Sequence, residues 1–239
     1  MRIHGLNKTT LLDYPEHVAA AVFLGGCNFR CPFCQNGDLV IRPESQPVID
    51  RAEVMEFLKK RKGILSGVCI TGGEPTLAAG LEEFIREVRE LGYLVKLDTN
   101  GYCPDTLCRL AEETLLDYIA MDIKSSMERY GEAAGVKDLD TERIRESIRI
   151  VMESGIGYEF RTTVVKELHG EEELTAIGRE IAGAERYFLQ SYRDSGAVIQ
   201  TGFHAYGRED LKRLAECVRP YVGNVRLRGV DERECQEDG

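Results

Sequence analysis

The sequence has 239 residues, enough for one large domain or two small ones built around a hydrophobic core. Hydrophobic residues make up 43% and charged residues 30%, as in soluble globular proteins, and the net charge is -10. This acidic balance argues against nucleic acid and against anionic membrane surfaces as partners, because both attract basic surfaces.

The longest uninterrupted apolar run, Val18 to Leu24, has seven residues, whereas a membrane-spanning helix needs about 20. The first residues contain no apolar signal segment with a small-residue cleavage site. We therefore expect a cytoplasmic protein, in which the eight cysteines stay reduced. A close group of cysteines in such a protein indicates metal binding or redox chemistry.

Short apolar segments that are rich in strand-forming residues alternate with helical patterns along the chain. They predict strands near 18–24, 67–71, 93–98, 117–122, 158–165, 186–190 and 222–227. Helices are expected over 51–63 with Asp50 as its cap, over 81–91 before Gly92, over 142–154 with Thr141 as its cap, and over 171–183 and 208–218.

This alternation predicts an α/β fold with a parallel sheet and helices outside it. Six or more repeats on one core favour a partial (β/α)6 barrel of the TIM type, with a doubly wound sheet as the alternative. The sequence has no low-complexity linker and no repeat. We therefore expect a single domain over 1–239, with a core of about 15–230 and a polar tail at 231–239.

Three cysteines lie within eight positions, directly after the first predicted strand: Cys27, Cys31 and Cys34. Ligands of α/β sheets bind at this carboxyl end of the strands, and thiolates hold iron–sulfur clusters. A structural zinc site needs a fourth ligand, and no histidine stands at finger-like spacing. A redox dithiol in CPFC is the other alternative. Three ligands on a four-iron cluster would leave one iron open for another molecule.

The stretch CNFRCPFC resembles the Cys-x3-Cys-x2-Cys motif of the radical S-adenosylmethionine (SAM) superfamily. The resemblance implies one [4Fe-4S] cluster on Cys27, Cys31 and Cys34, with SAM bound to the open iron. Reductive cleavage of SAM then yields methionine and a 5′-deoxyadenosyl radical. Phe33 is similar to the family aromatic near the adenine, and Asn36 matches a family asparagine.

TGGEP, at residues 71–75, follows the second predicted strand. It reads either as an ordinary strand-to-helix turn or as a ligand site, because glycines let the backbone approach a ligand closely. The segment resembles the family's GGE motif, which binds the SAM amino group. The resemblance assigns Gly72, Gly73 and Glu74 to the SAM site.

LDTNG (97–101) and MDIK (121–124) end the third and fourth predicted strands, where an aspartate is often only a helix cap. Together they resemble segments of glycyl-radical activating enzymes, such as those that act on pyruvate formate-lyase and on anaerobic ribonucleotide reductase. The resemblance implies a monovalent cation beside SAM and a lysine on the SAM carboxylate. The residues concerned are Asp98, Thr99 and Asp122 for the cation, Lys124 for the carboxylate, and Asn100 within the same motif.

Arg161 lies among apolar residues of the fifth predicted strand, so it needs an anion or a paired carboxylate. A salt bridge within the barrel is one interpretation, and the resemblance implies a SAM contact. Gln190 stands where the formate-lyase relative has a histidine, which is a departure from the pattern. The other cysteines are expected to be structural: Cys69, Cys103, Cys108, Cys217 and Cys235.

The resemblance spans about Asn7 to Gln190 and implies an activase that makes a glycyl radical on a partner enzyme. Its opening segment is most similar to the branch that activates anaerobic ribonucleotide reductase. The electron would come from a flavodoxin or ferredoxin. The alternatives are a radical SAM enzyme for a small molecule, such as a 7-carboxy-7-deazaguanine synthase, and a zinc-binding interaction module.

Overall fold

A single eight-stranded sheet forms the centre of the computed structural model, which describes residues 1–230. The strands lie in chain order, and all except the first are parallel. Their bounds are Ile3–Thr10 (β1), Ala19–Leu24 (β2), Gly67–Gly72 (β3), Leu94–Thr99 (β4), Tyr118–Asp122 (β5), Gly157–Val164 (β6), Tyr187–Ser191 (β7) and Val225–Arg228 (β8).

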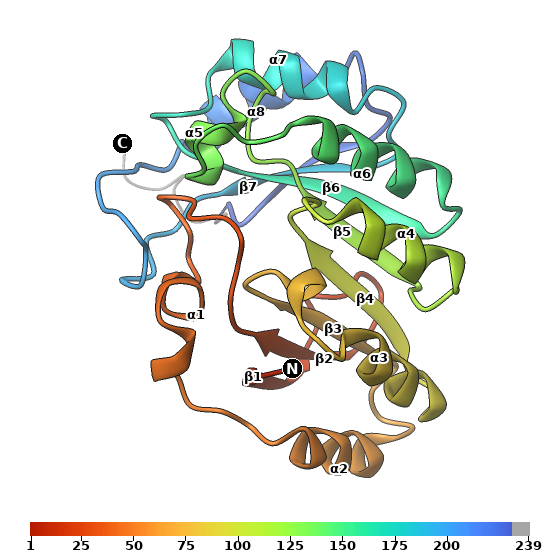
Figure 1. Ribbon diagram of the computed structural model, residues 1–239. Coiled ribbons are helices and arrows are strands. Elements are labelled where there is room, and N and C mark those ends of the chain that lie inside the picture. The colour runs from red at the N-terminus through yellow and green to blue at the C-terminus, as the bar shows by residue number, and fades with distance from the viewer. Residues whose placement is uncertain (231–239) are drawn as a thin grey trace, which may run out of the picture.

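Helices cover the outer side of the curved sheet, as Figure 1 shows for α3, α4, α6 and α7. The helices are Gly37–Ile41 (α1), Arg51–Arg61 (α2), Leu81–Glu90 (α3), Pro104–Glu112 (α4), Tyr130–Ala134 (α5), Glu142–Glu153 (α6), Glu171–Glu180 (α7) and Arg208–Val218 (α8), with short 3-10 turns at Pro43–Ser45 (η1) and Pro75–Leu77 (η2).

Strands β2 to β7 are each followed by a helix, so the predicted (β/α)6 arrangement is confirmed, with β1 and β8 added at its two edges. The unbroken strand order excludes the doubly wound alternative, in which the order reverses near the middle of the sheet. Because β1 and β8 do not pair with each other, the barrel is open between them.

The seven predicted strands are all present, with bounds shifted by three residues or fewer. Asp50 caps α2 as expected, since its carboxylate accepts a hydrogen bond from the Ala52 N–H at 2.7 Å. Thr141 is the N-cap residue of α6 as expected, but its side chain makes no capping bond, and Asp140 accepts from the Glu142 N–H instead. Strand β1 and the short helices α1 and α5 were not predicted, and the sheet begins at Ile3, before residue 15.

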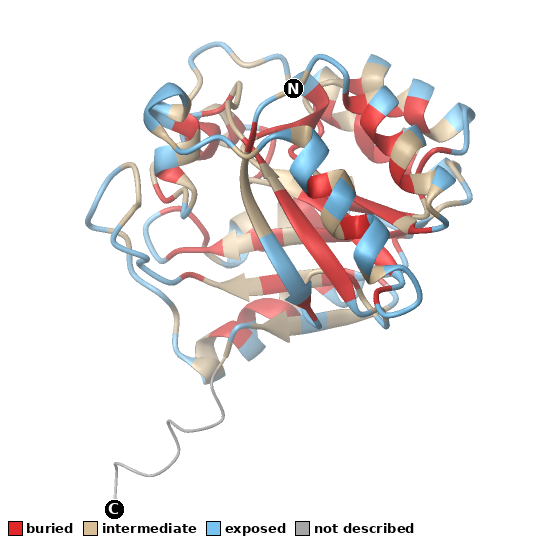
Figure 2. Ribbon diagram, turned by 90° about the horizontal axis from the view of Figure 1, so that it is seen from below, coloured by how far each residue is buried: buried red, intermediate tan, exposed pale blue. Residues whose placement is uncertain are grey.

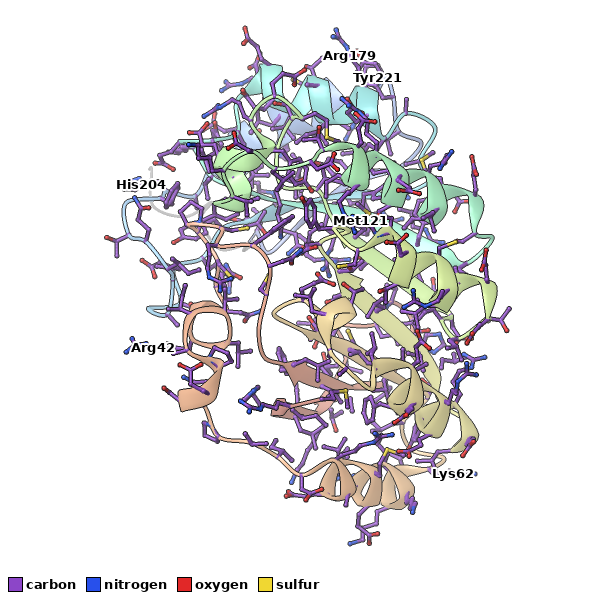
Figure 3. All side chains as sticks on the ribbon, in the orientation of Figure 1. Arg42, Lys62, Met121, Arg179, His204 and Tyr221 are labelled. Atoms are coloured by element: carbon purple, nitrogen blue, oxygen red, sulfur yellow. The ribbon has the colours of Figure 1, made fainter. Side chains whose placement is uncertain are left out.

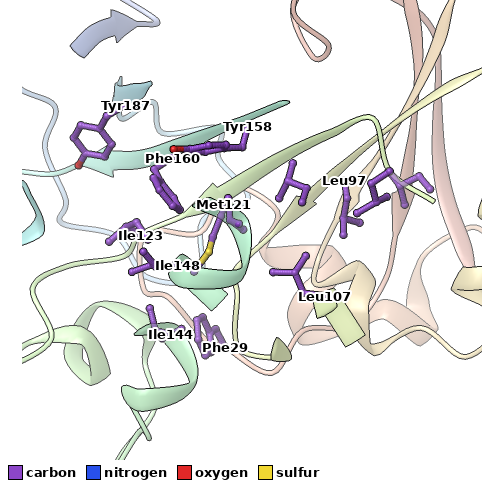
Figure 4. Close-up of a cluster of buried hydrophobic side chains, with 14 of the residues drawn as sticks. Phe29, Leu97, Leu107, Met121, Ile123, Ile144, Ile148, Tyr158, Phe160 and Tyr187 are labelled. Atoms are coloured by element: carbon purple, nitrogen blue, oxygen red, sulfur yellow. The ribbon is translucent and has the colours of Figure 1, made fainter. Parts of the chain in front are cut away.

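The two faces of the sheet have different chemistry, because successive side chains of a strand point to opposite sides. The outer face packs against the helices in one large hydrophobic cluster; Figure 4 shows Leu97, Met121 and Phe160 among helix residues such as Ile144. In Figure 2 the buried residues follow the strands and the helix surfaces turned toward them. In Figure 3, Met121 lies inside the molecule while Arg42 and Lys62 project outward.

The inner face is mostly polar, and aromatic rings close its amino-terminal end. Tyr14, in the loop after β1, packs on Tyr118 with ring centroids 6.0 Å apart, beside Ala19 at the start of β2. The carboxyl end of the strands is therefore the open end of the barrel interior. The predicted polar tail at 231–239 lies outside the described residues.

Across residues 1–230, no helix has both the length and the apolar character that a membrane crossing requires.

Candidate cofactor site

The cysteine loop leaves β2 at Leu24 and is held at several points. The Gly26 N–H donates to the Leu39 carbonyl, and the Arg30 N–H donates to the Ala134 carbonyl, both at 2.8 Å. Phe29 is 2% exposed and packs against Tyr102 and Tyr130. This buried ring anchors the loop in the hydrophobic core, so the backbone that carries the three thiols is fixed by packing.

Two N–H groups point at the sulfur of Cys27. The backbone N–H of Phe29 lies 3.3 Å from Sγ, and the side-chain amide of Asn100 lies 3.7 Å from it. The same amide donates to the Asn28 side-chain oxygen at 2.7 Å. Hydrogen bonds to a ligand sulfur stabilise its negative charge and tune the potential of a bound cluster. These donors therefore suit a thiolate ligand.

Burial disfavours the charged form of the cysteines. It raises the pKa of Cys27 to about 11 and that of Cys31 to about 12, and the nearby Lys124 ammonium opposes the shift in both. Metal binding supplies the positive charge that a buried thiolate needs, so such ligands lose their protons when the metal binds. Among residues 1–230, no three His, Cys, Asp or Glu side chains surround one position suited to a single metal ion.

Gly72 and Gly73 bring the end of β3 against the cysteine loop. The Gly73 N–H donates to the Leu24 carbonyl and the Glu74 N–H donates to the Gly26 carbonyl, both at 2.8 Å. A Cβ added at Gly73 would collide with the Gly26 carbonyl oxygen, and one at Gly72, where φ is +119°, would collide with Leu24. Both positions therefore require glycine for backbone packing, whatever they contact in a ligand.

Glu74 is 1% exposed, and its carboxylate is surrounded by donors. One oxygen accepts from the N–H and hydroxyl of Thr76 and from the Thr99 hydroxyl, and the other accepts from the Asn100 N–H at 2.6 Å. Burial raises the pKa of Glu74, although these four donors favour the charged form. The side chain thus fixes the turn after β4, on which Asn100 lies.

An ion-pair chain crosses the inner face near the open end. Arg161 Nε lies 2.8 Å from Asp122 Oδ1, and its Nη1 lies 3.3 Å from Asp98 Oδ2. Lys124 Nζ lies 3.2 Å from Asp122 Oδ2. Burial alone would raise the pKa of Asp122, but Arg161 and Lys124 outweigh it and lower that pKa to about 2. Arg161 therefore forms the salt bridge that was one of its two interpretations, and its contact with SAM stays a prediction.

A cavity of about 290 Å³ lies at this end of the barrel, close to the lower limit of about 300 Å³ for ligand pockets. It brings together nearly all the residues singled out in the sequence, from the cysteine loop and from the ends of β3 to β7. The predicted residues that line it are Cys27, Cys31, Phe33, Cys34, Asn36, Gly72, Gly73, Asp98, Thr99, Asn100, Asp122, Lys124, Arg161 and Gln190.

Glu74 is the one predicted residue outside this lining. Its suggested contact with an ammonium group stays a prediction, and its observed partners are the donors described above. The sequence did not single out Asp13, Phe29, Gln35, Val40, Thr71 and Thr163, which also line the cavity. Thr71 and Thr163 could have been identified from the sequence, because they lie on predicted strands. Asp13 could not, because it lies in a loop without a recognisable pattern.

His169 supports two lining residues from behind. Its Nδ1 accepts from the Val165 N–H at 3.1 Å, so Nε2 carries the proton and donates to the Lys124 carbonyl at 2.8 Å. The ring packs edge-on against Phe33, with centroids 5.9 Å apart. Burial lowers the pKa of His169, which keeps the ring neutral.

The other cysteines within residues 1–230 do not line the cavity. Cys69 is fully buried on β3 beside Lys96, and it does not line the cavity. Cys103, Cys108 and Cys217 are partly exposed free thiols outside the cavity lining. Cys235 lies outside the described residues. Their expected structural role stays a prediction.

Comparison with known proteins gives matches of two kinds. A protein of Methanocaldococcus jannaschii, whose assignment as a glycyl-radical enzyme activating enzyme is itself provisional, is 27% identical over 96% of both chains. A GTP 3′,8-cyclase of Helicobacter pylori is 28% identical over 63% of this chain and 48% of its own.

Among solved structures, SuiB of Streptococcus suis bound to its precursor peptide SuiA has a TM-score of 0.69 at 19% identity, over 87% of this chain and 48% of SuiB. SuiB has also been solved with SAM bound. This chain thus spans about half the length of SuiB and of the cyclase. At this level of identity, the match to SuiB shows a shared fold.

Residues 21–176 match the model of the radical SAM superfamily, from within β2 into α7. This region carries the three cysteines, the glycine pair and the ion-pair chain. The three thiols fit a cluster held by thiolates, and the ion-pair chain beside them fits a charged ligand. The chain therefore belongs to the radical SAM superfamily, whose members use a [4Fe-4S] cluster and SAM.

Proposed function

We propose that this chain is an activating enzyme that generates a glycyl radical on a partner enzyme. The observation that carries the proposal is the match along 96% of both chains to the M. jannaschii relative, which bears that name. The match to the GTP cyclase spans only 48% of that enzyme. The shared length therefore favours the activase over the small-molecule enzyme.

In this proposal Cys27, Cys31 and Cys34 hold the cluster, and the other lining residues hold SAM. Lys124 and Arg161 place positive charge where the SAM carboxylate can bind. Gly72 and Gly73 bring a backbone edge to the cavity. When bound, the cluster would supply one electron for the cleavage of SAM to methionine, and SAM would supply the 5′-deoxyadenosyl group that would accept the hydrogen atom of the glycine Cα. The walls of the cavity orient these groups and exclude water.

A groove beside the cavity supports a protein substrate. It has a volume of about 710 Å³ and lies along the open side of the barrel, next to β8. Gln35 and Gln190 line both the groove and the cavity, so the two spaces adjoin. A glycine on an extended loop can follow this path to near-attack distance, about 3–3.5 Å between reacting atoms. SuiB, which has the same fold, was solved with a peptide bound.

Leu12 offers the groove an apolar contact for a partner protein. It lines the groove and is 85% exposed, and the neighbouring Leu11 is 72% exposed. Exposed apolar side chains that gather at a groove mark interaction sites more often than isolated ones do. Covering one leucine contributes about 1.5–3 kcal/mol, or about ten- to a hundredfold in affinity.

The partner we propose is an anaerobic ribonucleotide reductase, because the segment before the cysteine loop resembles the branch that activates this enzyme. A flavodoxin or ferredoxin serves as the electron donor.

The test is anaerobic incubation of the reconstituted protein with SAM, dithionite and the candidate reductase, followed by electron paramagnetic resonance. We expect a glycyl radical that disappears when the acceptor glycine of the partner is replaced by alanine. Leu12→Asp should lower the radical yield about tenfold or more at limiting partner, while Ile64→Asp, at a 63% exposed site away from the groove, should not. If no radical forms and a purine nucleotide is consumed instead, the small-molecule function is correct.

A further inference from the structure

The ion-pair chain of the barrel interior continues to a buried lysine, Lys96. This residue lies on β4 two positions before Asp98, so both side chains point to the inner face. The side chain of Lys96 is 2% exposed. Its ammonium donates to Asp98 Oδ1 and lies 3.8 Å from Cys69 Sγ. Lysine is rarely buried to this extent unless a carboxylate partner holds it there.

With Lys96 included, each oxygen of the two carboxylates in the ion-pair chain faces a cationic partner. Asp98 faces Lys96 through one oxygen and Arg161 through the other. Asp122 faces Arg161 through one oxygen and Lys124 through the other. Three cations and two carboxylates leave the ion-pair chain itself with a net charge of +1. Its members Lys124 and Arg161 line the cavity and complement the carboxylate of SAM, whereas Asp13 lines the cavity outside this chain.

The hydroxyl group of Thr99, the third residue of the expected cation site, also has partners within the protein. The Thr99 hydroxyl donates to Glu74 at 2.8 Å and accepts from the Gly101 N–H at 3.1 Å. A bound Na⁺ or K⁺ needs oxygen atoms that are free of other cations, because like charges at contact distance repel. The arrangement of Asp98, Thr99 and Asp122 therefore does not fit the monovalent cation that the family resemblance implies.

We propose that the ammonium of Lys96 is a built-in counter-ion that takes the place of this cation, so that SAM binds without Na⁺ or K⁺. Lys96 acts through Asp98 as a positioning residue: it neutralises that carboxylate and leaves Arg161 and Lys124 arranged at the cavity. A tethered ammonium cannot dissociate, and a buried ion pair is screened by salt much less than an exposed one. The inference rests on SAM binding and is independent of the proposed protein substrate.

The first test measures the SAM affinity of the cluster-loaded protein by anaerobic calorimetry. The salt is NaCl, KCl or tetramethylammonium chloride at one ionic strength, because tetramethylammonium is too large to enter between the carboxylates. We expect dissociation constants within about twofold of one another. A tenfold or greater loss of affinity in tetramethylammonium chloride would overturn the proposal, and this test needs no variant.

The second test removes the charge. In tetramethylammonium chloride, Lys96→Ala should bind SAM about ten- to a hundredfold more weakly, the range for a lost charge-assisted contact. The space left beside Asp98 then admits a small cation. In KCl, NaCl or ethylammonium chloride, Lys96→Ala should therefore bind SAM at least fivefold more tightly than in tetramethylammonium chloride. Lys60→Ala, on the exposed face of α2, is the matched control and should behave as wild type in every salt.

Iron content and circular dichroism of each variant show whether the fold is kept. A Lys96→Ala protein that binds SAM as tightly as wild type in tetramethylammonium chloride would overturn the proposal. So would one that binds SAM equally weakly in every salt, because that result indicates lost packing and not a lost counter-ion.

Discussion

Replacing Glu74 by glutamine tests whether this carboxylate holds the turn after β4. The change keeps the size of the side chain and converts one oxygen into an NH₂ group. The best orientation of the amide keeps its oxygen on the three donors of Thr76 and Thr99. The NH₂ group then faces the N–H of Asn100, which loses its acceptor at 2.6 Å.

The expected loss of stability follows from this one backbone N–H without an acceptor. A buried donor without an acceptor costs about 1–3 kcal/mol. For a chain of this size, 1 kcal/mol corresponds to about 2–4 °C in Tm, so we expect Glu74→Gln to melt about 2–12 °C below wild type. Asn100 also contacts Cys27 Sγ, so the redox potential of the loaded cluster should shift in the same variant.

The assay is thermal unfolding of wild type and variant, prepared anaerobically and compared at one pH and one iron content. Glu90→Gln, at an exposed position of α3, is the control and should stay within about 0.5 kcal/mol of wild type. A Tm for Glu74→Gln equal to that of the control, with an unchanged cluster potential, would refute the role assigned to this carboxylate.

Two further predictions concern the cluster ligands and a buried histidine. Alanine at any one of Cys27, Cys31 or Cys34 should abolish the four-iron cluster and SAM cleavage, while Cys217→Ala should keep both. Iron and sulfide analysis of each variant measures the cluster content. A full cluster in any of the three variants would contradict the assignment. Burial lowers the pKa of His169 from 6.5, near the charged Glu173 and Arg129. In the unfolded chain this histidine is protonated as the pH falls through about 6.5, whereas in the native state it stays neutral. Its contribution to the free energy of unfolding is therefore fully present above that pH and is lost as the pH falls below it. His169→Gln should lose this part of the Tm decrease between pH 7 and pH 5.5, and an unchanged slope would contradict the reasoning.

The sequence was sufficient to predict the parallel strands and the place of the site, because both depend on local patterns. Apolar runs such as VAAAVFL mark a buried strand, and polar residues directly after such runs meet at the carboxyl edge of a parallel sheet. The prediction failed for β1, whose residues Asn7–Thr9 are exposed and carry no alternation. It also failed for α1 and α5, because helices of five residues are too short to show a helical pattern.

The roles of individual side chains depend on contacts between distant segments, which local patterns do not contain. Glu74 is drawn to Thr99 and Asn100 by a fold in which β3 lies beside β4. Lys96 could have been noticed, since a lysine within the apolar strand YLVKLD shares a face with Asp98. Arg161, the other partner of Asp98, stands 63 residues from Asp98 in the sequence, and only the sheet brings the two together.

The identity of strand order and chain order has a consequence for biosynthesis. Each strand from β2 onward can pair with the one made just before it, so the sheet can grow while the chain is being synthesised. The thiols at 27–34 leave the ribosome before Arg161 and Gln190, which complete the wall of the cavity around them. A nascent chain therefore carries the three cysteines without this wall until β7 has been made and has joined the sheet.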